Sequence, residues 1–174
     1  MATDGVIYAE ARWAPQQHLT GGLSAAAATE AVQAGLVDGM ESASRSGTTI
    51  IARQILCLMR HLDVPEDVVD LAVNHAPGVV GVDIAGPEDG FPLTPFTNAL
   101  TRIQAAGIHL TVHAGEAAGP ESVLDALDHG AERLGHGVRI IEDRDESEWG
   151  PIAQRVLSNQ VPLEVCPTSN TQTG

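Results

Sequence analysis

TVHAGE at residues 111–116 and RLGHG at residues 133–137 are the two stretches that decide the fold we predict. Each reads as a short apolar strand that ends in His, Gly or Glu. Barrels of parallel strands present catalytic side chains at the carboxyl ends of their strands in this way. A metal ligand, a proton carrier three residues later and a second His on a nearby strand suit attack by metal-bound water on a polarised C–N or C=N bond. These residues therefore predict a metal-dependent hydrolase.

Outward from these stretches, short apolar runs alternate with longer amphipathic ones along the chain. This alternation predicts βα units and a parallel sheet. Pro120 just inside a helix start and Gly130 just past its end fit the usual asymmetry of helix termini. We expect strands near 5–13, 48–58, 79–85, 108–113, 132–137 and 161–166, and helices near 23–45, 64–76, 94–106, 120–129 and 145–159.

The pattern contains six βα units, whereas a closed eight-stranded barrel needs about 250 residues. A six-stranded doubly wound domain is the alternative, but it would carry a Gly-rich phosphate loop after its first strand. The sequence at that place is APQQH at 14–18, which is no such loop. A chain of 174 residues fits one domain, so we expect residues 1–174 to form a single α/β domain.

The composition excludes several classes of function. The formal net charge of −14 argues against binding to phosphate backbones and suits a neutral or cationic small molecule. All nine basic residues are Arg, so the chain lacks the lysine that Schiff-base, pyridoxal-phosphate and P-loop enzymes require. Asp4, Glu10 and Arg12 leave no apolar run for a signal peptide, and no segment approaches the roughly 20 apolar residues of a membrane span. We therefore expect a cytoplasmic protein with no membrane or nucleic-acid partner.

The two cysteines, Cys57 and Cys166, are more than 100 residues apart. They form no Cys-x-x-Cys pair, so a disulfide framework is not expected. The same absence separates this chain from cytidine-deaminase-like enzymes, whose zinc is held by such a pair.

Several motifs, in this order and with helix-sized gaps, resemble the metal-dependent adenosine deaminase family. They are YAEARWAP at 8–15, VDIAG at 82–86, HAGE at 113–116, GPES at 119–122, GHG at 135–137 and CPTSN at 166–170. HAGE alone would be weak evidence for the family, because four residues recur by chance. The ordered set of motifs is strong evidence and spans nearly the whole chain.

The resemblance implies a partial (β/α)8 barrel of the TIM type that comprises strands two to seven. In that family the first strand ends in a His-x-His pair of zinc ligands and the eighth ends in an Asp pair. Neither is present here, so we expect an incomplete metallo-dependent hydrolase barrel whose Zn²⁺ ligands are mostly absent from this chain.

Three residues receive chemical roles from the resemblance. His113 matches a zinc ligand, although a single His in a strand is more often packed or exposed. Glu116 matches the general acid that protonates a purine ring nitrogen, for which its carboxyl must carry a proton; a Glu near a helix start also favours the macrodipole. His136 matches the residue that orients the attacking water, and packing between two glycines is the alternative.

Gly86 matches a residue whose backbone N–H reaches the purine, or it is a simple turn residue before a proline. Asp83 is expected to support the site, and Ser169 and Asn170 to brace the loop after the last strand. Glu121 lies in the first turn of a helix, where the macrodipole explains it without a catalytic role.

The resemblance implies hydrolytic deamination of adenosine or 2′-deoxyadenosine, a step of purine salvage, with a purine nucleoside as the small-molecule partner. Adenine deamination is a related alternative, and a non-catalytic, truncated purine-binding module is another. We expect the isolated chain to be inactive, and its oligomeric state stays open. Loss of two neighbouring strands would leave two unpaired edges and favour association.

Overall fold

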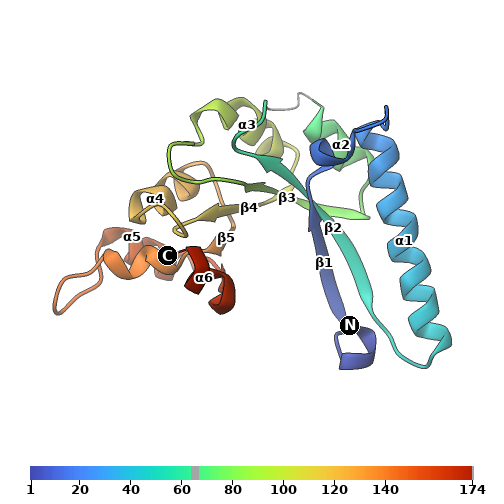
Figure 1. The fold of residues 1–174 in the computed structure, drawn as a ribbon. Helices are drawn as coiled ribbons and strands as arrows, with labels where there is room; N and C mark the ends of the chain where they lie inside the picture. Colours follow the sequence, from blue (N-terminus) through green and yellow to red (C-terminus); the bar gives the residue numbers. More distant parts are fainter. Residues whose placement is uncertain (64–66, 174) are drawn as a thin grey trace.

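Six parallel strands form a single curved sheet in the computed structural model, which describes residues 1–63 and 67–173. The strands lie in chain order, and each pairs in parallel with the next. Figure 1 shows the sheet curling as part of a barrel wall, which confirms the predicted partial barrel. The strands are β1 (Tyr8–Trp13), β2 (Ile51–Met59), β3 (Val79–Ala85), β4 (His109–Ala114), β5 (Arg133–His136) and β6 (Leu163–Glu164).

Helices connect these strands, and α2, α3 and α4 follow the convex side of the sheet in Figure 1. The α-helices are α1 (Ala25–Arg45), α2 (Val68–Asn74), α3 (Thr97–Ala105), α4 (Pro120–Asp128), α5 (Pro151–Ser158) and α6 (Pro167–Thr173). Short 3₁₀ turns are η1 (Ala2–Asp4), η2 (Pro15–His18), η3 (Thr94–Phe96) and η4 (Val138–Glu142). Among the described residues, no helix combines the length and the apolar character that crossing a membrane would require.

Local chemistry explains where several helices begin. The Ser24 hydroxyl accepts the N–H of Ala27 at 3.1 Å and so caps α1. Pro120 and Pro151 occupy the first turns of α4 and α5, where a missing N–H costs nothing. These signals place the helix starts close to the predicted positions for α1 and α4.

The predicted helix at 145–159 is wrong over its first six residues. The Asp145 carboxylate accepts the N–H groups of Ser147 and Glu148 at 2.8 and 2.9 Å. These bonds form a local turn that competes with a helix, so α5 begins only at Pro151. The last predicted strand is also shorter than expected, and α6 follows it. The predicted helix at 64–76 is observed as α2, and its residues 64–66 lie outside the described part of the chain.

The hydrophobic core lies between the convex face of the sheet and the helices. Alternate strand residues point to that side because successive side chains of a strand face opposite ways. The buried set from the strands includes Leu56, Val82, Ile84, Leu110, Val112 and Leu134, and the helices contribute Leu71, Leu100, Ile103, Val123 and Val156. The opposite, concave face carries mostly charged and polar side chains, among them Glu10, Arg12, Asp83, His113 and Arg133.

Candidate active site

His113 lies near the carboxyl end of β4, with its ring beside β3. Its Nδ1 is 3.0 Å from the Asp83 carboxylate, which is completely buried. An ionised carboxylate only accepts hydrogen bonds, so Nδ1 is the nitrogen that carries the proton in the neutral ring. The contact therefore leaves the lone pair of His113 on Nε2, the form that can bind a metal ion.

Glu116 and His136 come together from two different strand ends. His136 Nε2 is 3.5 Å from Glu116 Oε1, and the rings of His136 and His113 are 5.3 Å apart between centroids. The side-chain amide of Asn170 donates to His136 Nδ1 at 2.9 Å. Because Nδ1 accepts, the neutral His136 ring has its proton on Nε2, directed at Glu116.

Ser169 and Asn170, which we expected to brace the loop after the last strand, lie on helix α6. The Ser169 hydroxyl is 3.5 Å from Glu116 Oε1. Pro167 begins this helix three residues after the last residue of β6, which brings α6 to the carboxyl ends of the strands. Both residues thus contact the pair formed by Glu116 and His136.

Gly135 lets the His113 ring lie directly against β5. A Cβ added at Gly135 would meet the ring of His113 at 2.8 Å, closer than real Cβ atoms approach. The two residues are also partners in the register of β4 and β5. Glycine is required here by close packing.

Gly86 follows the last residue of β3, at the same edge of the sheet as the carboxyl end of β4. Its φ of +93° is unfavourable for any side chain, and a Cβ would lie 3.0 Å from His61 Nδ1. The backbone geometry thus accounts for glycine at this position.

A network of charges supports this site from the concave face, and the sequence analysis missed most of it. Arg12 Nε lies 3.0 Å from Asp83, and its Nη2 donates to Glu164 at 2.6 Å. Glu164 also pairs with Arg133, which reaches Glu10 at 2.8 Å. Burial alone would lower the pKa of Arg12, but the two carboxylates raise it above its usual value.

Cys57 belongs to the same network. Burial and the neighbouring Asp83 carboxylate raise the pKa of its thiol, and its Sγ lies 3.6 Å from Asp83. A thiol held protonated in this way is a poor nucleophile. The sequence contained one indication of this network, because Arg12 lies in the YAEARWAP motif. Its partners could not be identified from the sequence, because they lie up to 152 residues away.

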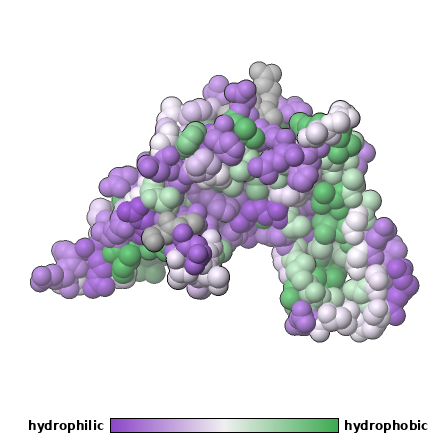
Figure 2. Space-filling model, viewed as in Figure 1, coloured by the Kyte–Doolittle hydropathy of each residue, from purple (hydrophilic) through white to green (hydrophobic). Residues whose placement is uncertain are grey.

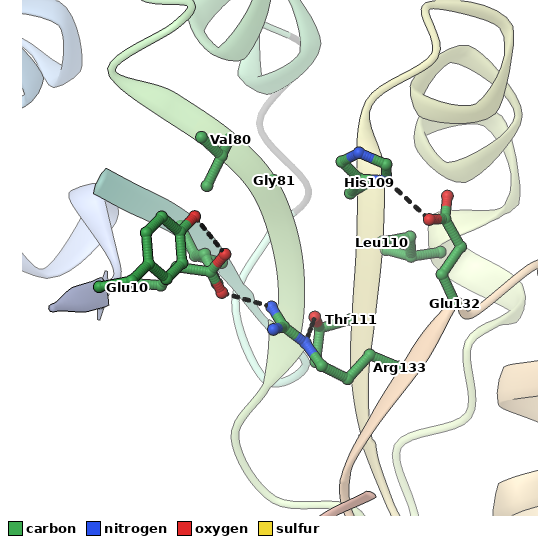
Figure 3. A pocket seen from close by; sticks show the side chains of 10 residues that line it. Glu10, Val80, Gly81, His109, Leu110, Thr111, Glu132 and Arg133 are labelled. Carbon is green, nitrogen blue, oxygen red and sulfur yellow. Dashed lines mark hydrogen bonds and ion pairs between the residues drawn. The ribbon is translucent and has the colours of Figure 1, made fainter. Parts of the chain in front are cut away.

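A cavity of about 420 Å³ opens at the other end of the concave face (Figure 3). It is lined by residues of strands β1 to β5, and neither His113 nor Glu116 is among them. Its charged groups pair with each other: Glu10 with Arg133, and His109 with Glu132. These groups are already partnered, so the cavity is a weaker candidate for chemistry than the carboxyl ends of the strands.

Comparison with known proteins agrees with this geometry. The sequence profile of one family, Adenosine deaminase, matches residues 1–174. The chain belongs to the adenosine deaminase family. The adenosine deaminase of Mycolicibacterium gilvum is 43% identical over all of the chain and half of its own length. Adenosine deaminase 1 of Streptomyces coelicolor is 44% identical over all of the chain and 46% of its own length. The chain spans about half the length of these curated relatives.

Solved structures of the adenosine deaminase fold superpose well on the chain. An adenine deaminase from Arthrobacter aurescens has a TM-score of 0.80 at 29% identity, covering 99% of this chain and 50% of its own. The N6-mAMP deaminase of Arabidopsis has the same TM-score at 28% identity, with the same coverage of both chains. An amidohydrolase from Burkholderia ambifaria with bound Zn has a TM-score of 0.79 at 30% identity, covering 97% of this chain and 45% of its own.

This member of the adenosine deaminase family offers one metal ligand among its described residues, and not a complete metal site. His113 offers Nε2, with Asp83 behind its ring as metal-binding histidines usually have. Within residues 1–63 and 67–173, no group of three or more His, Cys, Asp and Glu could hold an ion. A catalytic zinc usually takes three protein ligands. His113 therefore stands as a single candidate ligand.

Proposed function

We propose that this chain forms the part of an adenosine deaminase that supplies Glu116, His136, Gly86 and His113 to the hydrolysis of adenosine or 2′-deoxyadenosine. The observation that carries the proposal is the contact of 3.5 Å between Glu116 Oε1 and His136 Nε2, at the strand ends beside His113. Inosine or 2′-deoxyinosine and ammonia are the products, and purine salvage is the proposed role.

In the proposed reaction Glu116 and His136 act on the two reactants. Glu116 gives a proton to a purine ring nitrogen, which makes the neighbouring six-carbon electrophilic. When the Glu116 carboxyl turns to the purine, the Nε2–H of His136 is released from it, hydrogen-bonds the water that attacks this carbon and so orients it. Asn170 holds the His136 ring in place through Nδ1. The N–H of Gly86 binds the purine, since glycine has no side chain of its own to block the approach.

Zinc is the proposed metal, with His113 as one of its ligands, and bound zinc supplies the Lewis acidity that activates water. Adenosine is the preferred substrate because the curated relatives at 40–44% identity are named adenosine deaminases. Adenine is the second candidate, because the Arthrobacter aurescens structure with a TM-score of 0.80 is named an adenine deaminase.

The test is a chimera in which residues 1–174 replace the matched half of the Mycolicibacterium gilvum adenosine deaminase. We expect zinc-dependent loss of the adenosine absorbance band, and no turnover above background from residues 1–174 alone. In the chimera, Glu116→Gln should lower kcat by about 1000-fold, because it removes the proton donor while keeping the shape. Glu132→Gln, an exposed carboxylate at the other end of β5, is the matched control and should leave kcat within about twofold.

Two results would contradict the proposal. One is a Glu116→Gln chimera that retains full turnover. The other is a folded chimera that binds zinc but acts on neither adenosine nor adenine. Faster turnover of adenine than of adenosine would select the second candidate substrate.

A further inference from the structure

The turn at residues 115–118, which follows β4 and carries Glu116, is held by a buried carboxylate from another loop. Glu88 Oε1 accepts the N–H of Gly115 at 2.5 Å. Its Oε2 accepts the N–H groups of Glu116, Ala117 and Ala118 at 3.0, 2.8 and 3.0 Å. One carboxylate therefore binds four successive backbone amides of this turn.

The surroundings of Glu88 favour the ionised form of its carboxyl. Its residue is only 7% exposed, and burial by itself would raise the pKa of its carboxyl. Hydrogen bonds from Ser122 and from the backbone of the turn outweigh burial and hold the pKa of Glu88 below its ordinary value. Successive backbone N–H groups that point to one place form a site that binds anions in proteins. In this protein the carboxylate of Glu88 occupies that site.

Arg60 fixes the loop that carries Glu88 and touches β4 as well. This Arg is buried; its Nη1 donates to the carbonyl of Phe91 at 2.6 Å and its Nη2 to the carbonyl of His113 at 2.8 Å. The N–H of Phe91 in turn bonds the carbonyl of Glu88 at 3.2 Å. The loop at 88–91 is thus tied to the backbone of His113 by Arg60 and to the turn at 115–118 by Glu88.

We propose that Glu88 is a positioning residue that keeps the Glu116 carboxyl against His136 by holding the four amides of the turn. The inference rests on the proposed function for its catalytic meaning. Glu88 itself touches no reacting atom in this scheme. Its removal releases the turn, so Glu116 loses its fixed distance to His136, and displacements of about 1 Å in such groups can cost about 100-fold in rate.

The test uses NMR of the chimera of residues 1–174 with the remaining half of the Mycolicibacterium gilvum adenosine deaminase, and compares the wild type with Glu88→Gln and Asp143→Asn. A bond to a carboxylate moves an amide proton downfield, and the amide protons of residues 115–118 should shift back upfield in Glu88→Gln because the side-chain NH₂ of Gln faces N–H donors. The amides of residues 115–118 should exchange at least about tenfold faster. The nuclear Overhauser contact between the Glu116 side chain and the His136 ring should also be lost.

Asp143→Asn is the matched control, because its Oδ2 accepts the N–H of Ala153 at 2.7 Å and holds a different helix start. It should leave all three readouts unchanged. The proposal is overturned if Glu88→Gln keeps the contact between Glu116 and His136, or if Asp143→Asn abolishes it equally. Should Glu88→Gln fail to fold, the wild type decides, since amides of residues 115–118 that exchange as fast as those of an exposed loop contradict the proposal. The experiment needs no turnover, so an inactive protein would sink the proposed function without touching this result.

Discussion

At the residue scale, the candidate site depends on how closely β5 approaches the His113 ring. The missing side chain of Gly135 leaves room for that ring, and Asp83 fixes it from the other side at 3.0 Å. A methyl group added at Gly135 would therefore have to displace the His113 ring, which the Asp83 carboxylate holds in place.

We expect Gly135→Ala to lower the free energy of unfolding by about 2 kcal/mol, because the new Cβ would lie 2.8 Å from the His113 ring. Chemical denaturation measures this change. Gly35→Ala in the middle of α1 is the matched control, since nothing lies within 4 Å of its added Cβ. Alanine favours a helix over glycine, so this control should raise stability by up to about 1 kcal/mol. Equal effects of the two substitutions would show that packing against His113 is unimportant.

At the scale of elements, the loop after β3 and the turn after β4 behave as one unit because Glu88 and Arg60 connect them. The bonds involved join residues 27 to 53 positions apart in sequence. They hold together the strand ends that bear Gly86 and Glu116. This connection depends on an ionised carboxylate, so it responds to acid.

The sign of the pH dependence follows from the lowered pKa of Glu88. A carboxyl whose pKa is lower in the folded state than in the unfolded state stabilises the fold fully at a pH above its ordinary pKa of 4.5. This stabilisation is lost as the pH falls through the pKa of the folded state. We expect the free energy of unfolding of the wild type to decrease below about pH 5. Glu88→Gln should be less stable at pH 7, and its stability should fall less steeply in acid.

Urea unfolding at a series of pH values measures both slopes. Glu132→Gln is the control, because its carboxylate is 58% exposed and pairs with an exposed His109. It should keep the slope of the wild type. Identical slopes for the wild type and Glu88→Gln would contradict the assignment of the acid response to Glu88.

At the scale of the whole molecule, the sheet has two outer strands, β1 and β6, in the part of the chain that is described. Figure 2 shows hydrophobic residues gathered on the arm formed by β1, β2 and α1, in contrast to the mostly hydrophilic remainder of this face. Ile7 is 75% exposed and Tyr8 50% exposed beside the β1 edge. Unpaired edges with exposed apolar residues invite pairing with other chains.

We therefore expect the 174-residue chain to associate at micromolar concentrations. Light scattering after size-exclusion chromatography should give a mass above the 18.1 kDa of one chain, rising with concentration. Ile7→Lys places a charge at the edge and should shift the chain toward the monomer. The control Val73→Lys changes a residue that is 50% exposed on α2, which packs on the inner strand β3, and should not. A sharp monomer peak with a cooperative melt at all concentrations would contradict this expectation.

The sequence by itself determined the order of strands and helices and the edge at which His113, Glu116 and His136 lie. Hydrophobic periodicity and helix-end residues are local signals, and the carboxyl ends of parallel strands must share one edge of the sheet. The sequence missed the late start of α5, because the Asp145 turn competes with a helix that the pattern also allows.

Only the tertiary structure decided which side chains support those residues. Glu88 reads as a loop carboxylate, and Arg12 as one charge in a strand. Their roles arise from partners at distances of 27 to 152 positions along the chain. Contacts of that kind depend on the curvature of the sheet and on side-chain direction, neither of which leaves a periodic trace in a single sequence.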